Sequence, residues 1–142
     1  GKQLMYEQSA RVPLIVRWPE RFGQGVKSEA LVSSLDLIAT LLDVAGAEMP
    51  VLHGQSLAPL LEGSTQSHSE ALFCEWGPEK MVREGPWKYV YHPEREIQQL
   101  FNLHDDPQEL ENLAGTQAAL ERRLRERLLD WLISTETKPN SL

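Results

Sequence analysis

The sequence contains a single cysteine, Cys74, which excludes an internal disulfide and leaves the redox compartment undetermined. Basic residues are also scarce: 14 lysines and arginines stand against 21 aspartates and glutamates, for a formal net charge of −7. Nucleic acids and anionic membranes bind basic surfaces, so neither is an expected partner. No apolar run approaches the roughly 20 residues that cross a bilayer, and the first residues lack a basic-then-apolar signal pattern. The sequence therefore predicts no membrane partner and indicates no particular localisation.

Residue patterns that hold metals or activate nucleophiles are absent as well. The four histidines have no metal-ligand spacing, and neither a Ser-His-Asp arrangement nor a phosphate-cradling glycine loop occurs. The pair Asp105-Asp106 is better explained as the cap of a helix than as part of a metal loop. We therefore expect no metal site in this chain.

The N-terminal region combines a polar loop with an apolar run. Residues 1–11 are polar and irregular, whereas Val12 to Trp18 is almost continuously apolar and is closed by Pro19. A run without polar alternation predicts a strand covered on both faces, as in a parallel sheet packed between helices. The polar loop would then hold charged groups at the edge of an α/β sheet.

A helix is predicted over residues 35–45. Ser33 with Asp36 three residues later resembles a capping box, and Gly46 suits the left-handed position that follows a helix. The helix is apolar nearly all round, so it needs cover on more than one side.

The second half of the sequence predicts an antiparallel meander and a long helix. Short candidate strands are separated by Gly-Pro or Pro-Glu pairs and cover residues 71–76, 80–84, 87–92 and 97–103. In the third strand Tyr89 lies on one face and Lys88 on the other. A short helix should begin at Asp106 and break at Gly115, and the last helix should span residues 117–134.

Several patterns resemble the sulfatase family, in the right order along the chain. The first is G-K-x-x-x-Y-E-x-x-x-R-V-P at residues 1–13, which resembles the segment after the family's last metal-binding loop. The others are V-S-S-L-D-L at 32–37, G-Q-S-L at 54–57, M-V-R at 81–83 with W-K-Y at 87–89, and L-F-N-L at 100–103 with D-P at 106–107. Each pattern is weak alone, but the ordered set is specific. It spans nearly the whole chain and corresponds to the C-terminal portion of such an enzyme.

The resemblance implies an α/β plus α+β fold of the alkaline-phosphatase-like superfamily, similar to arylsulfatases and choline-sulfatases. Residues 1–49 would form the C-terminal end of the large sulfatase α/β catalytic domain, contributing a strand and a helix. Residues 50–142 would form a C-terminal α+β subdomain, with a small antiparallel sheet and a C-terminal helix. The full enzyme would hydrolyse sulfate monoesters with a formylglycine nucleophile and calcium.

Two parts of that machinery are missing from this sequence. The nucleophile arises within a C/S-x-P-x-R motif, which does not occur, and Cys74 is followed by Glu75-Trp76-Gly77. The family's calcium ligands lie ahead of the position of Lys2. The chain is therefore expected to be a fragment that is inactive alone.

The resemblance also suggests roles for particular residues. Lys2 would contact the sulfate ester and offset negative charge on the transferred group and leaving oxygen. Tyr6, Glu7 and Arg11 would be structural supports, with an ion pair between Glu7 and Arg11 as the favoured interpretation. Near the strand ends of the meander, two residues are candidates for substrate contact: Arg83 and His92.

Two alternative functions stay open. The chain could belong to a phosphonate or phosphate ester hydrolase of the same superfamily, or it could be a stand-alone interaction module with a sulfatase-derived fold. A sulfate ester is the expected partner of the whole enzyme. A homo-oligomer is expected for the chain alone, through the N-terminal strand or the apolar helix, because an open strand edge and an uncovered helix face favour self-association.

Overall fold

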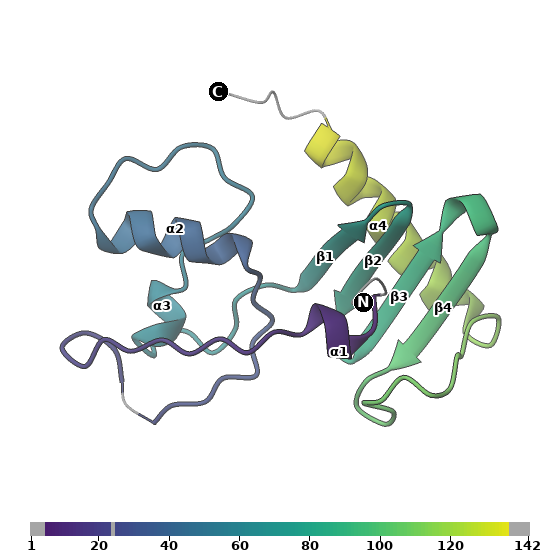
Figure 1. The fold of residues 1–142 in the computed structure, drawn as a ribbon, viewed down its shortest axis with the longest axis horizontal. Coiled ribbons are helices and arrows are strands. Elements are labelled where there is room, and N and C mark those ends of the chain that lie inside the picture. The colour runs from purple at the N-terminus through teal and green to yellow at the C-terminus, as the bar shows by residue number, and fades with distance from the viewer. Residues whose placement is uncertain (1–4, 24, 137–142) are drawn as a thin grey trace. The chain divides into compact units, whose positions relative to one another are not determined.

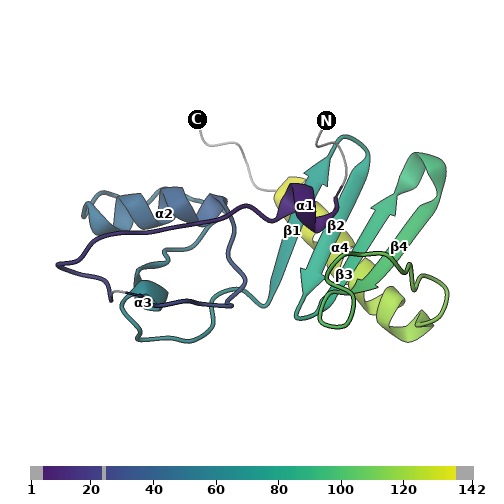
Figure 2. The ribbon, with the colours of Figure 1, turned by 60° about the horizontal axis from the view of Figure 1, so that its bottom comes forward.

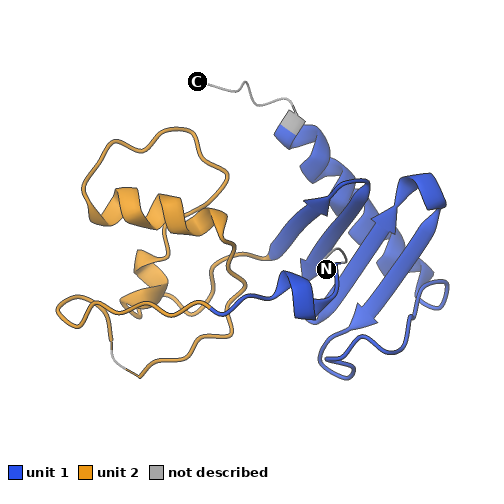
Figure 3. Cartoon of the chain, viewed as in Figure 1, with its two compact units in different colours: residues 1–13, 71–140, 142 blue, residues 14–70, 141 orange. Residues whose placement is uncertain are grey.

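The computed structural model describes residues 5–23 and 25–136. They form two compact units: the sheet unit, with residues 5–13 and 71–136, and the helix unit, with residues 14–70 (Figure 3). No helix in these described ranges is long and apolar enough to cross a membrane. The units group residues by their contacts within this chain, and a domain boundary after residue 49 remains a prediction.

The sheet unit is built on the meander that the sequence predicts. Its strands are β1 (Ala71–Trp76), β2 (Glu79–Glu84), β3 (Trp87–His92) and β4 (Ile97–Asn102), in the order β1-β2-β3-β4 and all antiparallel (Figure 1). Two-residue Gly-Pro turns join the first three strands, and Gly77 and Gly85 both have φ of +55°. A glycine at the first turn position permits the tight hairpins whose twist matches that of the strands.

Both faces of this sheet are covered. Helix α4 (Ala118–Glu136) packs on one face, where the buried core contains Val82, Tyr89, Leu100, Leu124 and Leu128. The N-terminal segment packs on the opposite face, including the one-turn helix α1 (Glu7–Ala10), and Met5 is buried there against Met81 and Val90. Figure 2 shows α1 and α4 on opposite sides of the strands.

The helix unit contains α2 (Leu35–Val44) and the one-turn helix α3 (Ala58–Leu61). The predicted capping is confirmed in part, since Asp36 Oδ2 accepts a hydrogen bond from the Ser33 backbone N–H at 2.7 Å. Gly46 has a φ of +63°, as expected after a helix. His68 Nε2 lies 3.2 Å from the same Asp36 oxygen, and both side chains are buried.

The G-Q-S-L segment at 54–57 lies against the start of α2. Asp36 Oδ1 accepts a hydrogen bond from Gln55 N at 2.9 Å, and Thr40 Oγ1 accepts one from Leu57 N at 2.8 Å. A Cβ on Gly54 would lie 2.2 Å from the Leu35 carbonyl oxygen. The pattern therefore has a local structural cause: glycine permits the close approach, and the following amides satisfy buried acceptors of the helix.

Among the described residues, helix α2 is buried along one side and exposed along another. Ala39 and Thr40 are buried, whereas Leu35, Ile38 and Leu41 are 54%, 54% and 62% exposed. These three apolar side chains therefore form an exposed stripe on a helix that the sequence predicts to be buried on more than one side.

Two predicted elements do not form. Residues 12–18 contain no strand, and Ile15 is 91% exposed. A strand needs a neighbour for its N–H and C=O groups, and none of the described strands pairs with this segment. The helix predicted from Asp106 is also wrong, because residues 106–117 form turns and irregular backbone and Glu109 adopts a left-handed φ of +56°.

Candidate functional site

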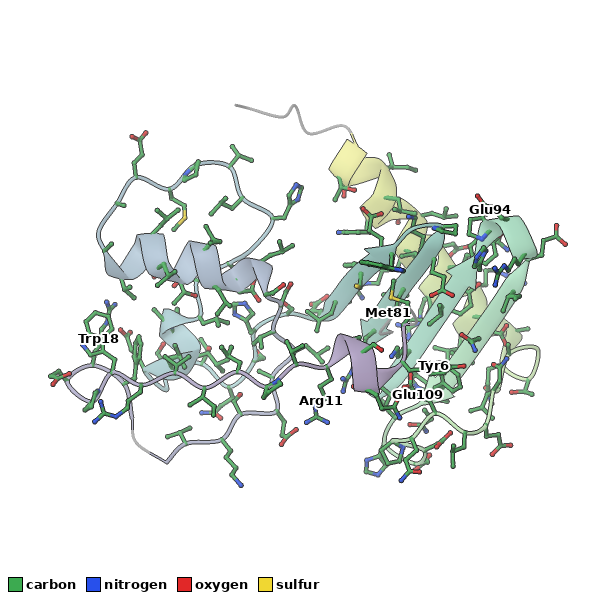
Figure 4. All side chains as sticks on the ribbon, viewed as in Figure 1. Tyr6, Arg11, Trp18, Met81, Glu94 and Glu109 are labelled. Atoms are coloured by element: carbon green, nitrogen blue, oxygen red, sulfur yellow. The ribbon has the colours of Figure 1, made fainter. Side chains whose placement is uncertain are left out.

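The candidate site is centred on Glu7, the first residue of α1. Its side chain reaches the sheet, where Oε2 lies 3.0 Å from Arg83 Nη1 and Oε1 lies 3.1 Å from Lys88 Nζ. The favoured pair between Glu7 and Arg11 is therefore wrong. Arg11 is exposed and forms no ion pair with any residue in the described ranges. In Figure 4 its side chain projects from the chain just after α1.

A second carboxylate completes the arrangement. Glu109 Oε1 lies 2.8 Å from Lys88 Nζ, and both side chains are fully buried. Glu109 Oε2 also accepts a hydrogen bond from the Glu7 backbone N–H at 2.5 Å. We call Glu7, Arg83, Lys88 and Glu109 the buried ionic cluster; its formal charges, two negative and two positive, balance.

The strand register explains why the two cations lie together. Arg83 on β2 and Lys88 on β3 are directly paired residues, so their side chains stand on the same face of the sheet. This is the face covered by the N-terminal segment, opposite α4. A lysine buried there requires carboxylate partners, because an unpaired buried charge is strongly destabilising.

The backbone of Glu109 is adapted to the cluster. A left-handed conformation costs a residue other than glycine roughly 1–2 kcal/mol. Breaking a buried ion pair by removing one partner costs about 3–5 kcal/mol, so the contacts with Lys88 can offset the backbone cost. The turn is further held by Asp106, whose carbonyl accepts from Glu109 N at 3.2 Å and whose Oδ2 accepts from Glu111 N at 2.9 Å.

Tyr6 fixes the segment to β4. Its hydroxyl oxygen accepts a hydrogen bond from Gln99 Nε2 at 3.0 Å, and its ring lies against Phe101 with centroids 6.0 Å apart. Met5, just before it, is 5% exposed. Figure 4 shows Tyr6 and Glu109 beside α1. Successive residues at positions 5, 6 and 7 are thus anchored at different places on one face of the sheet.

The other predicted site residues are placed as follows. Lys2 lies outside the described residues. Arg83 belongs to the buried ionic cluster, and its side chain is 25% exposed. His92 is buried at the end of β3, where its Nδ1 accepts from Arg95 N at 3.3 Å and caps the 3₁₀ turn Pro93–Arg95.

The sequence patterns do not identify Lys88 or Glu109 as site residues. The alternation of β3 placed Lys88 on the face opposite Tyr89, but it gave no sign that this face is covered. Glu109 falls within the helix predicted from Asp106, and its contact with Lys88 comes from a turn that the local pattern does not predict.

The described residues contain no cluster of metal-ligating side chains, and their cysteine is not activated. Nowhere in residues 5–23 and 25–136 do three or more His, Cys, Asp or Glu side chains gather as they would around a metal. Burial raises the pKa of the Cys74 thiol, the opposite of what activates a cysteine nucleophile. Cys74 packs with Met5, Met81 and Val90 as a small apolar residue.

Comparison with known families gives one match over nearly the whole chain. Residues 1–134 match the family described as N-sulphoglucosamine sulphohydrolase, C-terminal. Arylsulfatase K of Xenopus laevis is 34% identical over 131 residues, which cover 80% of this chain and 24% of the relative. Choline-sulfatase of Rhizobium meliloti (strain 1021) is 37% identical over 121 residues, covering 80% and 23%. The chain thus spans about a quarter of the length of the curated relatives it matches.

Solved structures share the fold. The structure of BT4656 in complex with its substrate, D-glucosamine-2-N,6-O-disulfate, aligns with a TM-score of 0.84 at 25% identity, covering 97% of this chain and 31% of that protein. The phosphonate monoester hydrolase of Silicibacter pomeroyi aligns with a TM-score of 0.80 at 26% identity, covering 94% and 31%. The predicted α/β plus α+β fold of the sulfatase type is confirmed by these likenesses.

Proposed function

Because the chain belongs to the family described as N-sulphoglucosamine sulphohydrolase, C-terminal, we propose that it is the C-terminal part of a sulfuric ester hydrolase that cleaves sulfate monoesters. The observation that carries the proposal is the ordered family match over residues 1–134. The sequence patterns fall within the same residues, and the first of them contains Tyr6 and Glu7, which are tied to the sheet.

In this proposal Lys2 contacts the sulfate group of the substrate. Its ammonium would stabilise the negative charge that develops on the leaving oxygen and on the transferred group. Tyr6 and Glu7 would hold the segment that follows, through the Gln99 hydrogen bond and the buried ionic cluster. Arg11 would support the segment through its backbone, since its N–H donates to the Glu7 carbonyl at 2.9 Å and caps α1.

Of the two candidate substrate contacts, Arg83 is the stronger. Its side chain is 25% exposed. The His92 imidazole is buried and already accepts the Arg95 N–H. We therefore propose Arg83 as a secondary contact and His92 as a structural cap.

The whole protein would take its nucleophile and metal from residues outside this chain. A formylglycine would supply the attacking oxygen, and calcium would supply positive charge for the sulfate. No described residue of this chain is assigned to either group, and the chain alone is expected to bind no calcium and to have no sulfatase turnover.

A second candidate function is hydrolysis of phosphonate or phosphate monoesters, favoured by the fold shared with a phosphonate monoester hydrolase. A non-catalytic interaction module is a third possibility, and it predicts no turnover by the whole protein. The test is the turnover of 4-nitrophenyl sulfate, 4-nitrophenyl phosphate and a phenylphosphonate ester by the whole protein that carries this chain. A kcat/KM highest for the sulfate ester supports the proposal, and a preference for the phosphonate ester would replace it with the second candidate.

A further inference from the structure

We propose that Lys88 and Glu109 are positioning residues of the proposed sulfatase. Together with Glu7 they would clamp the segment Met5–Ala10 on the sheet, and so fix the chain that leads to Lys2, three residues before Met5. The inference rests on the proposed function for its catalytic consequence, but the clamp itself is a property of the described residues.

The first support is the way in which Lys88 bridges two parts of the chain. Its Nζ lies 3.1 Å from Glu7 on the N-terminal segment and 2.8 Å from Glu109 on the turn after β4. The side chain is fully buried, so water does not compete for its three donors. Lys88 thus links the carboxylates of Glu7 and Glu109 to strand β3.

The second support is that Glu109 holds the segment by its backbone as well. Its Oε2 accepts the Glu7 N–H at 2.5 Å, while Oε1 faces Lys88. The amides of the first turn of a helix have no acceptor within the helix, so an external carboxylate is needed to satisfy this one. One side chain therefore fixes both the position and the direction of α1.

The third support is the contrast with the apolar contacts nearby. Met5 and Ala10 pack against Met81 and Val90, and such contacts are non-directional. Charge-assisted hydrogen bonds depend on distance and angle, and they fix one register of the segment. A displacement of about 1 Å far from the reacting atoms can cost on the order of 10²-fold in rate, so a fixed register matters for Lys2.

The experiment uses the whole protein that carries this chain, with two readouts. Lys88→Met keeps the length of the side chain and leaves two carboxylates facing one arginine. Lys88→Met with Glu109→Gln restores the balance, leaving Glu7 paired with Arg83. Lys80→Met is the matched control, because Lys80 lies on β2 and pairs with the more exposed Glu75 at 3.1 Å.

The first readout is peptide-resolved hydrogen exchange. Lys88→Met should raise exchange in residues 5–11 by at least about tenfold, the charge-balanced double variant should show a similar rise because the clamp is still missing, and α4 should keep its protection in both. The Lys80→Met variant should match the wild type. If residues 5–11 stay as protected in Lys88→Met as in the wild type, the clamp is overturned. If the single variant fails to fold and the double variant folds with residues 5–11 as protected as in the wild type, the clamp is equally overturned.

The second readout is sulfate-ester turnover. Lys88→Met should lower kcat by roughly 10–100-fold with KM changed less than threefold, and the double variant should show a loss of similar size. An unchanged kcat together with raised exchange would show that the clamp does not position Lys2. A wild-type protein without sulfatase turnover would end the proposed function, while the exchange result would still decide whether the clamp exists.

Discussion

Replacing Gly54 by alanine should loosen the helix unit much more than an ordinary glycine substitution. The added Cβ would lie 2.2 Å from the carbonyl oxygen of Leu35, 2.4 Å from its carbonyl carbon and 2.8 Å from Asp36 N. These are backbone atoms at the start of α2, so no flexible side chain can move aside. The segment that contains Gly54 must therefore shift away from the helix.

The size of the effect follows from the hydrogen bonds that this shift breaks. Asp36 Oδ1 would lose the Gln55 N–H, and Thr40 Oγ1 would lose the Leu57 N–H. Both acceptor residues are buried, and leaving a buried polar group unsatisfied costs about 1–3 kcal/mol. Two such losses predict a destabilisation of roughly 2–6 kcal/mol, toward the upper half because the Asp36 acceptor is charged.

Amide exchange of α2 measures this change as the free energy of local opening. Gly63→Ala is the control: its φ is +77° and a Cβ there meets nothing within 4 Å, so only the backbone cost of about 1–2 kcal/mol applies. Gly54→Ala should exceed this control by at least about 1 kcal/mol. A Gly54→Ala protein whose α2 amides exchange as slowly as the wild type would refute the reasoning.

Three further outcomes are expected. Leu124→Ala should destabilise the sheet unit by about 2–5 kcal/mol in denaturant unfolding, because Leu124 is fully buried. Leu129 is 47% exposed, so Leu129→Ala should cost under about 1 kcal/mol. Equal losses would contradict the packing of α4. Burial raises the pKa of Cys74, so its thiolate fraction at neutral pH is below that of a free thiol. Alkylation of Cys74 by iodoacetamide should therefore be slower than that of glutathione at pH 7, and it should accelerate as the pH rises. A rate equal to that of glutathione would count against the burial. The isolated chain should scatter light as a dimer or larger species at micromolar concentration. Ile15→Lys or Ile38→Lys should shift it toward monomer, since both isoleucine side chains are exposed. A monomeric wild-type chain would contradict the predicted self-association.

The elements that the sequence predicts well are those with local causes. The meander follows from alternating strands and from Gly-Pro turns, and each observed strand agrees with its predicted span within one residue. Helix α2 follows from its own capping residues, Ser33 and Asp36. Such signals lie within a few positions of the structure that they specify.

The missed features depend on partners far away in the sequence. The predicted partner of Glu7 is Arg11, four positions away, whereas its observed side-chain partners on the sheet lie 76 and 81 positions away. Glu109 adopts a left-handed backbone conformation in place of the predicted helix, and its carboxylate is buried beside Lys88. The apolar run at 12–18 has strand composition, yet composition does not supply the neighbouring strand that pairing requires.

The measurement that tests the central claim most directly is sulfate-ester turnover by the whole protein with and without Lys2. Lys2→Ala should lower kcat by roughly 10²–10³-fold, as loss of one charge-stabilising donor does in other enzymes. Lys27→Ala, which removes an exposed lysine of the helix unit, should leave kcat within about twofold of the wild type. Loss of turnover in the first variant and retention in the second is the result expected if this chain carries part of a sulfatase active site. A Lys2→Ala protein that turns over sulfate esters as fast as the wild type would contradict it.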